Sequence, residues 1–214
     1  MKRQLTALLL TVFALSLVGC GEKATVQSET RTVYAMDTVM NLTVYGENAA
    51  AALESAEQEL HTLDESVLSR TAEGSELYAL NAANGETVIY GADDALPALI
   101  EAALTISDAT NGAFDPTLAP VLDAWGFTKD EHHVPSADEL AALLGHTGLD
   151  QVTLKETADG YAVTLLDGAQ LDLGGIAKGY AADVLRAQLE EESITSATLD
   201  LGGDVFVMGK KSDG

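Results

Sequence analysis

Residues 171–209 read LDLGGIAKGYAADVLRAQLEEESITSATLDLGGDVFVMG, an order that predicts a strand, a helix and a second strand. The short apolar run at 171–173 predicts the first strand, which leads into a glycine pair. Apolar residues then recur at close to helical spacing, at Ile176, Tyr180, Val184 and Leu189. This spacing predicts a helix that begins at Ile176 and frays at the acidic residues 190–192, and residues 197–201 predict the second strand. The tetrapeptide DLGG occurs at 172–175 and at 200–203, so both copies are predicted to lie at strand ends.

The glycine pair Gly174-Gly175 at the start of the predicted helix is typical of an anion-binding site. It removes two Cβ atoms where free backbone N–H groups and the helix dipole point outward. Lys178 follows in the first turn, where the dipole disfavours a cation, so a negative ligand explains this lysine best. Asp172 precedes the glycines and is placed to accept a hydrogen bond from a ligand or to approach a metal. The alternative interpretation is that the glycines only permit a tight turn and that Lys178 is solvated.

Three further motifs precede this stretch along the chain. They are MDT at 36–38, SEL at 75–77 leading to Asn81, and GAFDPTLAPVLDAWGF at 112–127. Together with DLGGIAKGYAAD at 172–183, these motifs resemble the flavin transferases of the ApbE family over about residues 32–209. The resemblance implies an α+β fold, related to the T-fold, in which mixed sheets carry flanking helices. It also implies a magnesium-dependent enzyme that transfers FMN from FAD to a threonine or serine hydroxyl of a target flavoprotein and releases AMP.

The resemblance also assigns roles to individual residues of this chain. It implies that six residues contact FAD: Met36, Ala113, Phe114, Asp115, Asp172 and Lys178. It implies further that the backbone carbonyl of Gly175 is a magnesium ligand. At position 37 the chain has Asp where the family usually has Gly, and Arg70 receives no role. Considered alone, Met36 also fits a core residue, and Asp115 before a proline also fits an ordinary turn.

The C-terminal end of the sequence leads to a further expectation. Family members continue beyond the second Gly-Gly strand, and their later part supplies an Asp and a Thr to the metal site. We therefore expect an incomplete domain over residues 32–214 that holds only part of that metal site. Such a domain is also expected to have unpaired strand edges.

The N-terminal residues predict a bacterial lipoprotein signal. Two cations precede an apolar run at 5–17 that is too short for an ordinary membrane span, and the run leads to Cys20. We expect residues 1–19 to be removed, Cys20 to be lipidated, and residues 20–31 to form a tether. The lipid anchor is then expected to hold the protein on the bacterial cell membrane, facing the periplasm or the cell exterior. An uncleaved anchor or a plain secretory signal is the alternative.

Composition limits the partners of the protein. The formal net charge of −23 argues against nucleic acid, because phosphate backbones are held by clusters of Lys and Arg. Cys20 is the only cysteine, which excludes a disulfide within the chain and cysteine catalysis in the domain. Salt screens distant carboxylates beyond roughly 8 Å, so an anionic cofactor must be held by local groups. Lys178, helix N–H groups and a divalent cation are such groups, so magnesium also follows from the charge balance.

The remaining elements are predicted from local patterns. Apolar and polar residues alternate at Met40, Leu42 and Val44, which predicts one strand over 32–45 with a single buried face. Helices are predicted at 48–66, 94–111 and 136–145, the last with a capping box, and strands at 86–90, 151–155, 161–166 and 170–173. Trp125 and Phe127 are predicted to pack beneath the loop at 112–117.

Two other functions remain open from the sequence. If water replaced the target hydroxyl, the same site would be an FAD pyrophosphatase that yields FMN and AMP. A non-catalytic lipoprotein that binds a flavin is the second alternative, and it agrees with a lipid anchor and a partial metal site. For a transferase, the resemblance implies a target subunit in a membrane-bound redox complex that faces outside the cytoplasm.

Overall fold

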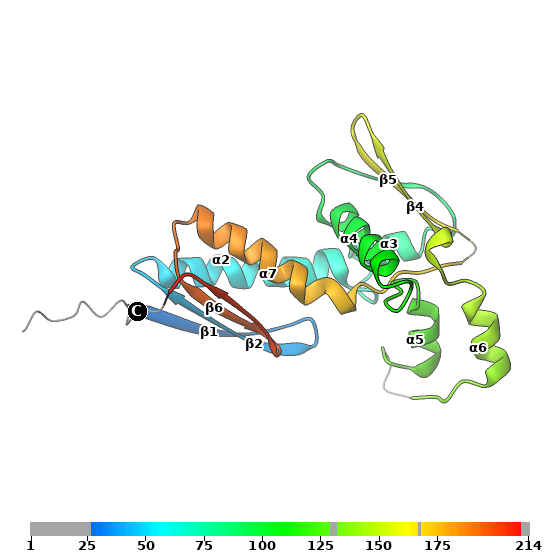
Figure 1. Cartoon of the computed structure of the whole chain (residues 1–214), viewed down its shortest axis with the longest axis horizontal. Helices are drawn as coiled ribbons and strands as arrows, with labels where there is room; N and C mark the ends of the chain where they lie inside the picture. The colour runs from blue at the N-terminus through cyan, green and yellow to red at the C-terminus, as the bar shows by residue number, and fades with distance from the viewer. Residues whose placement is uncertain (1–26, 129–131, 167, 211–214) are drawn as a thin grey trace, which may run out of the picture.

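The computed structural model describes residues 27–128, 132–166 and 168–210. Its helices are α2 (Ala49–His61), the π-helix η1 (Thr62–Leu68), α3 (Glu76–Asn81), α4 (Ala95–Ala109), α5 (Ala119–Trp125), α6 (Ala137–Leu144), the short 3₁₀ turn η2 (Leu149–Gln151) and α7 (Gly174–Glu191). Its strands are β1 (Ser28–Ala35), β2 (Thr38–Tyr45), β3 (Val88–Tyr90), β4 (Val152–Thr157), β5 (Gly160–Leu165), β6 (Ala197–Leu201) and β7 (Asp204–Met208). Figure 1 shows an elongated molecule, with the larger sheet at one end and α5 and α6 at the other.

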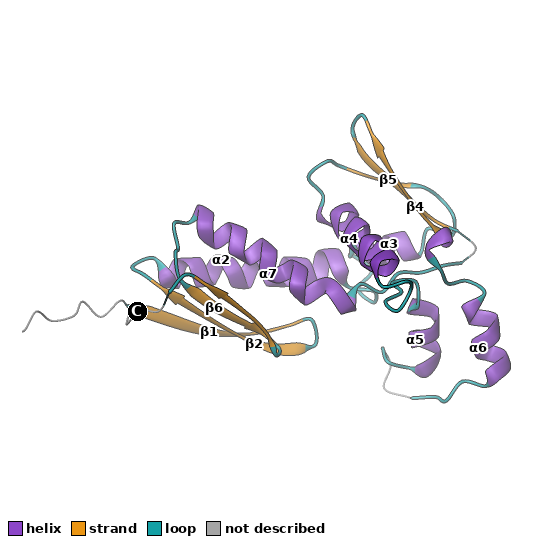
Figure 2. Cartoon of the chain, in the orientation of Figure 1, coloured by secondary structure: helices purple, strands orange, loops and turns teal. Residues whose placement is uncertain are grey.

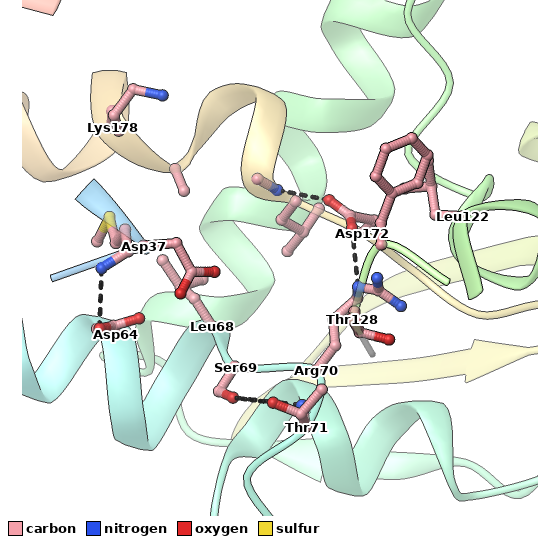
Figure 3. Close-up of a pocket in the computed structure, with 15 residues that line it drawn as sticks. Asp37, Asp64, Leu68, Ser69, Arg70, Thr71, Leu122, Thr128, Asp172 and Lys178 are labelled. Atoms are coloured by element: carbon pink, nitrogen blue, oxygen red, sulfur yellow. Dashed lines mark hydrogen bonds and ion pairs between the residues drawn. The ribbon is translucent and has the colours of Figure 1, made fainter. Parts of the chain in front are cut away.

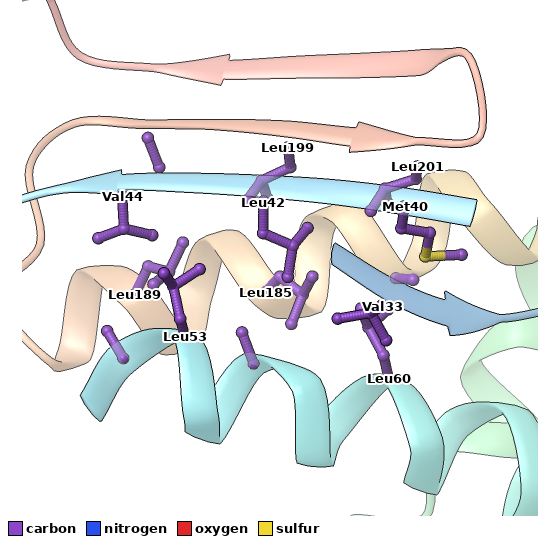
Figure 4. Close-up of a cluster of buried hydrophobic side chains, with 14 of the residues drawn as sticks. Val33, Met40, Leu42, Val44, Leu53, Leu60, Leu185, Leu189, Leu199 and Leu201 are labelled. Atoms are coloured by element: carbon purple, nitrogen blue, oxygen red, sulfur yellow. The ribbon is translucent and has the colours of Figure 1, made fainter. Parts of the chain in front are cut away.

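The larger sheet has four antiparallel strands in the order β1-β2-β6-β7. The predicted alternation is confirmed, because Met40, Leu42 and Val44 are fully buried on one face. Helices α2 and α7 cover that face, and Figure 4 shows Leu60 and Leu185 pointing from them toward the strands. Burying one face of a sheet against amphipathic helices provides the first of two hydrophobic cores.

The single strand predicted over 32–45 is instead a hairpin of β1 and β2. Met36 and Asp37 form its turn, and both have positive φ angles, 51° and 57°. A turn of this kind is usually signalled by Asn-Gly or Gly-Gly, which explains why Met-Asp did not predict it. Strand β1 begins at Ser28, so residues 28–31 of the expected tether belong to the sheet.

The smaller sheet lies at the other end of the molecule (Figure 2) and has the order β3-β5-β4. Its strands agree with three of the predicted ones, at 86–90, 151–155 and 161–166, within a few residues. With α3 and α4 it encloses the second core, which includes Leu77, Leu80, Leu99, Ile100, Val163 and Leu171. The predicted α+β class with flanking helices is therefore confirmed, and both sheets are antiparallel.

Residues 171–173, predicted as a strand, have no strand pairing, and Gln170 before them forms only an isolated parallel bridge with Leu118. Asn81 at the end of α3 holds Leu171: its Oδ1 accepts from the Leu171 N–H at 2.7 Å, and its Nδ2 donates to the Leu171 carbonyl at 3.0 Å. The Asp172 N–H donates to the Pro116 carbonyl at 2.7 Å. The segment is thus fixed by one side chain and one loop carbonyl, which local apolar character alone does not predict.

Helix α7 begins at Gly174, two residues earlier than predicted, and ends at Glu191 as expected. Its buried face consists of Ala177, Ala181, Leu185 and Leu189: Leu189 is as predicted, and the other three each lie one residue after a predicted position. The shift arises because α7 contacts both cores: Ile176 packs against the smaller-sheet core, Val184 against the larger-sheet core, and Tyr180 against both. Apolar residues consequently spread over more than one side of the helix.

Helices α5 and α6 form the end of the molecule away from the larger sheet. The capping box of α6 is confirmed: Ser136 Oγ accepts from the Glu139 N–H at 3.2 Å, and Glu139 Oε2 accepts from the Ser136 N–H at 3.4 Å. The predicted packing of Trp125 and Phe127 is wrong, because these side chains are 37% and 69% exposed. None of the described helices is long and apolar enough to cross a membrane.

Candidate functional site

A pocket of about 420 Å³ lies where the β1–β2 turn, η1, α5 and the start of α7 meet (Figure 3). Its charged lining residues are Asp37, Asp64, Arg70, Asp172 and Lys178, and its other lining residues are Met36, Leu68, Ser69, Thr71, Leu122, Phe127, Thr128, Leu173, Gly174 and Ala177. The pocket combines apolar walls with a few placed polar groups, as small-molecule sites usually do. It therefore offers space for a ligand with both a ring system and charged groups.

Three of the predicted site residues meet in this pocket, namely Met36, Asp172 and Lys178. They come from the β1–β2 turn, from the segment before α7, and from α7 itself. Folding thus brings together residues that are far apart in the sequence.

Asp172 forms two interactions within the protein. Its Oδ1 accepts a hydrogen bond from the Gly174 N–H at 2.9 Å, and its Oδ2 lies 2.8 Å from Arg70 Nε. The first interaction satisfies one of the free N–H groups at the start of α7. The second ties the carboxylate to the loop that follows η1. Both oxygens of Asp172 are therefore held in defined positions at the pocket edge.

The cation of Lys178 is also paired. Its Nζ lies 3.4 Å from Asp204 Oδ2 at the start of β7, and the lysine side chain is 32% exposed. A helix that started at Ile176, as predicted, would have Lys178 in its first turn. Because α7 begins at Gly174, Lys178 is instead the fifth residue of the helix. The second DLGG copy forms the adjacent β6–β7 turn, where the Gly203 N–H donates to Asp200 Oδ1 at 2.8 Å. Lys178 therefore connects the helix to the turn of the second motif.

The remaining predicted residues lie outside the pocket lining. Asp115 Oδ1 accepts hydrogen bonds from the Thr117 N–H at 2.8 Å and from the Thr117 hydroxyl at 2.5 Å, so its carboxylate forms a local turn. Ala113 is exposed, and Phe114 is half-buried. The Phe114 ring lies against Gly175, where an added Cβ would be only 2.9 Å from its Cε2. This contact joins residues 113–115 to the start of α7. Cys20, the predicted lipidation site, lies outside the described residues.

The resemblance implies a magnesium site at the Gly175 carbonyl. Within residues 27–128, 132–166 and 168–210, no three His, Cys, Asp or Glu side chains gather at a spacing that would hold a metal. Gly175 lies in the first turn of α7, and Asp172 is occupied by Arg70 and by the Gly174 N–H. The donor groups in the described part of the chain thus do not fit a complete magnesium centre.

The sequence matches the ApbE family over residues 36–214. The chain belongs to the ApbE family. Among curated relatives, the FAD:protein FMN transferase of Treponema pallidum is 36% identical over 199 residues, which cover 90% of this chain and 55% of that protein. The FAD:protein FMN transferase of Escherichia coli K12 is 27% identical over 225 residues, which cover 100% of this chain and 64% of that protein.

Solved structures of ApbE proteins share the fold of the chain. The ApbE protein of Thermotoga maritima has a TM-score of 0.78 and 32% identity, covering 86% of this chain and 60% of that chain. The apo form of the Pseudomonas stutzeri flavinyl transferase ApbE has a TM-score of 0.77 and 27% identity, covering 88% and 61%. The predicted ApbE-like fold is therefore confirmed. The chain spans less than two thirds of the length of each of these four relatives.

Several pocket residues were not predicted from the sequence, chiefly Asp64, Arg70 and Phe127. Asp64 carries no local signal, since it lies in an amphipathic helical pattern, and the position of Phe127 at the end of the motif at 112–127 predicts packing beneath a loop and not a pocket wall. Arg70 does carry one: it is the only lysine or arginine in residues 32–128. An isolated cation in a strongly acidic chain indicates a specific partner more than a general surface role.

Proposed function

We propose that the protein transfers FMN from FAD to a threonine or serine hydroxyl of a target flavoprotein. The hydroxyl oxygen forms a bond to the FMN phosphorus, the bond from that phosphorus to the bridging oxygen breaks, AMP leaves with that oxygen, and the hydroxyl proton passes to water. Membership of the ApbE family and the names of the relatives support this activity. The observation that carries the proposal is the pocket in which Met36, Asp172 and Lys178 come together.

The pocket residues suit the two parts of FAD. Met36, Leu68 and Leu173 provide apolar surface that fits a flavin ring, and Met adapts well to flat aromatic groups. Lys178 supplies a positive charge for the pyrophosphate, as a point charge on a flexible stem. Its ion pair with Asp204 is partly exposed, so an anionic ligand can compete for the lysine at modest cost.

A magnesium requirement is part of the proposal and rests on the family resemblance. Magnesium would neutralise the pyrophosphate and polarise the phosphorus. The donor groups of the described residues alone do not form a complete magnesium centre. Release of AMP from FAD, measured with magnesium and again after EDTA, tests the requirement directly.

We also propose that the protein is a lipoprotein anchored at Cys20, facing the periplasm or the cell exterior. The apolar run before Cys20 supports this placement, which suits a target subunit in a membrane-bound redox complex. Radioactive palmitate labelling of the wild-type protein and of Cys20→Ala tests the anchor. The anchor predicts label in the wild type and none in the variant, whereas equal labelling would contradict it.

The transferase is tested against its two alternatives with the full chain purified in detergent and supplied with FAD and magnesium. Chromatography follows AMP and FMN, and mass spectrometry follows FMN on a membrane fraction that contains flavoproteins. A transferase yields AMP with FMN covalently attached to protein. A pyrophosphatase yields AMP with free FMN, and a flavin-binding lipoprotein leaves FAD intact.

A further inference from the structure

Arg70 lines the pocket and pairs with two carboxylates, Asp172 at the pocket edge (Figure 3) and Asp123 outside the pocket lining. Its Nε is 2.8 Å from Asp172 Oδ2, and its Nη1 is 3.0 Å from Asp123 Oδ1 in α5. Its side chain is only 11% exposed. Since residues 32–128 contain no other lysine or arginine, no neighbouring cation in that part of the sequence can replace it.

The two ion pairs explain how this cation tolerates burial. A guanidinium taken out of water is costly unless charged partners surround it. Arg70 uses two different N–H groups for two carboxylates, which the planar fork of an arginine permits. A lysine at position 70 has a single nitrogen and no rigid fork, so it cannot reproduce both contacts in the same geometry.

The charge balance argues that Arg70 acts through Asp172 and not as a direct ligand for phosphate. Arg70, Asp123 and Asp172 together carry a formal charge of about −1, which does not attract an anion. Lys178, with a single partly exposed partner, is the better placed cation in the pocket. The effect of Arg70 is therefore to be sought in the position of the Asp172 carboxylate.

The backbone around Asp172 is fixed by other groups, whereas its side chain is held only by Arg70 and the Gly174 N–H. The neighbouring Leu171 is held by Asn81, and the Asp172 N–H by the Pro116 carbonyl. The cap on the Gly174 N–H depends on the rotation of the carboxylate about the Cβ–Cγ bond. Arg70 holds the second carboxylate oxygen and so favours the orientation in which the first one caps α7.

We propose that Arg70 is a positioning residue, which orients the Asp172 carboxylate at the start of α7 and thereby sets the affinity of the pocket for FAD. The effect on affinity rests on the proposed flavin transferase function. The orientation of Asp172 does not, since it follows from the two ion pairs and the cap alone. The two parts of the proposal can be measured separately.

The first test is a double-mutant cycle on FAD affinity, measured by flavin fluorescence with the full chain in detergent. Arg70→Lys and Asp172→Asn are each expected to weaken binding roughly tenfold, since each disturbs a charge-assisted hydrogen bond. The double variant is expected to bind no more weakly than the weaker single variant, because Arg70 acts through Asp172. Additive losses, or unchanged affinity in Arg70→Lys, would overturn the proposal.

The second test does not require FAD. Hydrogen exchange of residues 172–177 is compared in the wild type, Arg70→Lys and Asp123→Asn, with Arg186→Lys as the control. Arg186 forms an exposed pair with Glu190 on the same helix, away from the pocket. We expect faster exchange at the start of α7 in Arg70→Lys and in Asp123→Asn, and unchanged exchange in Arg186→Lys. Unchanged exchange in both would refute the positioning role.

These measurements distinguish failure of the proposal from failure of the proposed function. A wild-type chain that binds no FAD contradicts the flavin site, and with it the affinity part of the proposal, while hydrogen exchange still decides whether Arg70 orients Asp172. If Arg70→Lys fails to fold, Asp123→Asn supplies the evidence, because it retains Arg70 and removes one of its two anchors.

Discussion

The backbone N–H of Met36 donates a hydrogen bond of 2.9 Å to Asp64 Oδ2 and so joins the β1–β2 turn to the π-helix η1. Within η1, Leu63 packs into the larger-sheet core and Val67 into the smaller-sheet core. π-Helical turns are rare in proteins, and those that occur often lie at functional sites. This one directs Asp64 toward the pocket while its neighbours connect the two cores.

Loss of this hydrogen bond is expected to destabilise the turn. Asp64→Ala leaves the Met36 N–H without its charged acceptor, which is expected to lower the free energy of unfolding by about 1–2 kcal/mol. Urea unfolding measures the change. Asp64→Asn retains an acceptor oxygen and serves as the matched control, with a smaller expected loss. Equal stability of wild type and Asp64→Ala would show that the hydrogen bond contributes nothing to stability.

A glycine at position 37 is expected to stabilise the protein. Asp37 has a φ of 57°, a left-handed conformation that glycine adopts without steric cost. Asp37→Gly is expected to raise the free energy of unfolding by up to about 1 kcal/mol, less the entropy that glycine adds to the unfolded chain. Asp37→Val is expected to lower it, since a β-branched residue is strained there. If both variants shift stability in the same direction, the backbone explanation is wrong.

The contact between Gly175 and Phe114 predicts a coupled pair. A Cβ at position 175 would lie 2.9 Å from Phe114 Cε2, so Gly175→Ala must displace the ring. We expect a loss of about 1 kcal/mol in the free energy of unfolding, although alanine is the better helix former. In a Phe114→Ala background the same substitution is expected to be neutral or stabilising. Thermal unfolding of the four proteins measures the coupling, and additive effects would exclude it.

The titration of Glu76, at the start of α3, is expected to make the free energy of unfolding depend on pH. Burial raises the pKa of the Glu76 carboxyl above its ordinary 4.5, and the nearby Asp94 carboxylate raises it further. The folded state thus binds this proton more tightly than the unfolded chain does. Stability is therefore lost as the pH rises from 4.5 through the raised pKa of the folded state. Burial also raises the pKa of Tyr90 to about 12, so this neighbour stays neutral in that range.

Urea unfolding between about pH 4 and about pH 8 tests the role of Glu76. Glu76→Gln is expected to flatten the fall in stability above pH 4.5, because glutamine does not titrate. Asp94→Asn is expected to lower the pKa of Glu76 and to narrow the pH range of the effect. Glu101→Gln, an exposed carboxylate on α4, is the control. A slope identical in Glu76→Gln and wild type would contradict the assignment.

Local patterns were sufficient for much of the fold. Alternation at Met40, Leu42 and Val44 identified the buried face of β2, and a serine with a glutamate three residues later identified the start of α6. These features depend on neighbours in sequence, where periodicity and capping chemistry are informative. The β1–β2 turn was missed because Met36 and Asp37 are unusual residues for a left-handed turn.

Long-range contacts account for the other differences. The segment before α7 has the composition of a strand, but Asn81, 90 residues away from Leu171, takes both of the Leu171 backbone groups. Met36, Asp172 and Lys178, which the motifs single out, line one pocket, whereas the link from Arg70 to Asp172 is visible only in the folded chain. Hydrophobic periodicity in the sequence does not reveal a contact between residues so far apart. The same is true of Asp64, which reaches Met36 across 28 residues.

Titration of FAD against the full chain in detergent measures whether FAD binds in the pocket beside Lys178. Lys178→Ala is expected to weaken binding on the order of tenfold, because it removes the cation available to the pyrophosphate. Arg186→Ala, on the same helix but outside the pocket, is expected to leave affinity unchanged. Equal affinity of the wild type and Lys178→Ala would show that the pyrophosphate of FAD does not bind at Lys178.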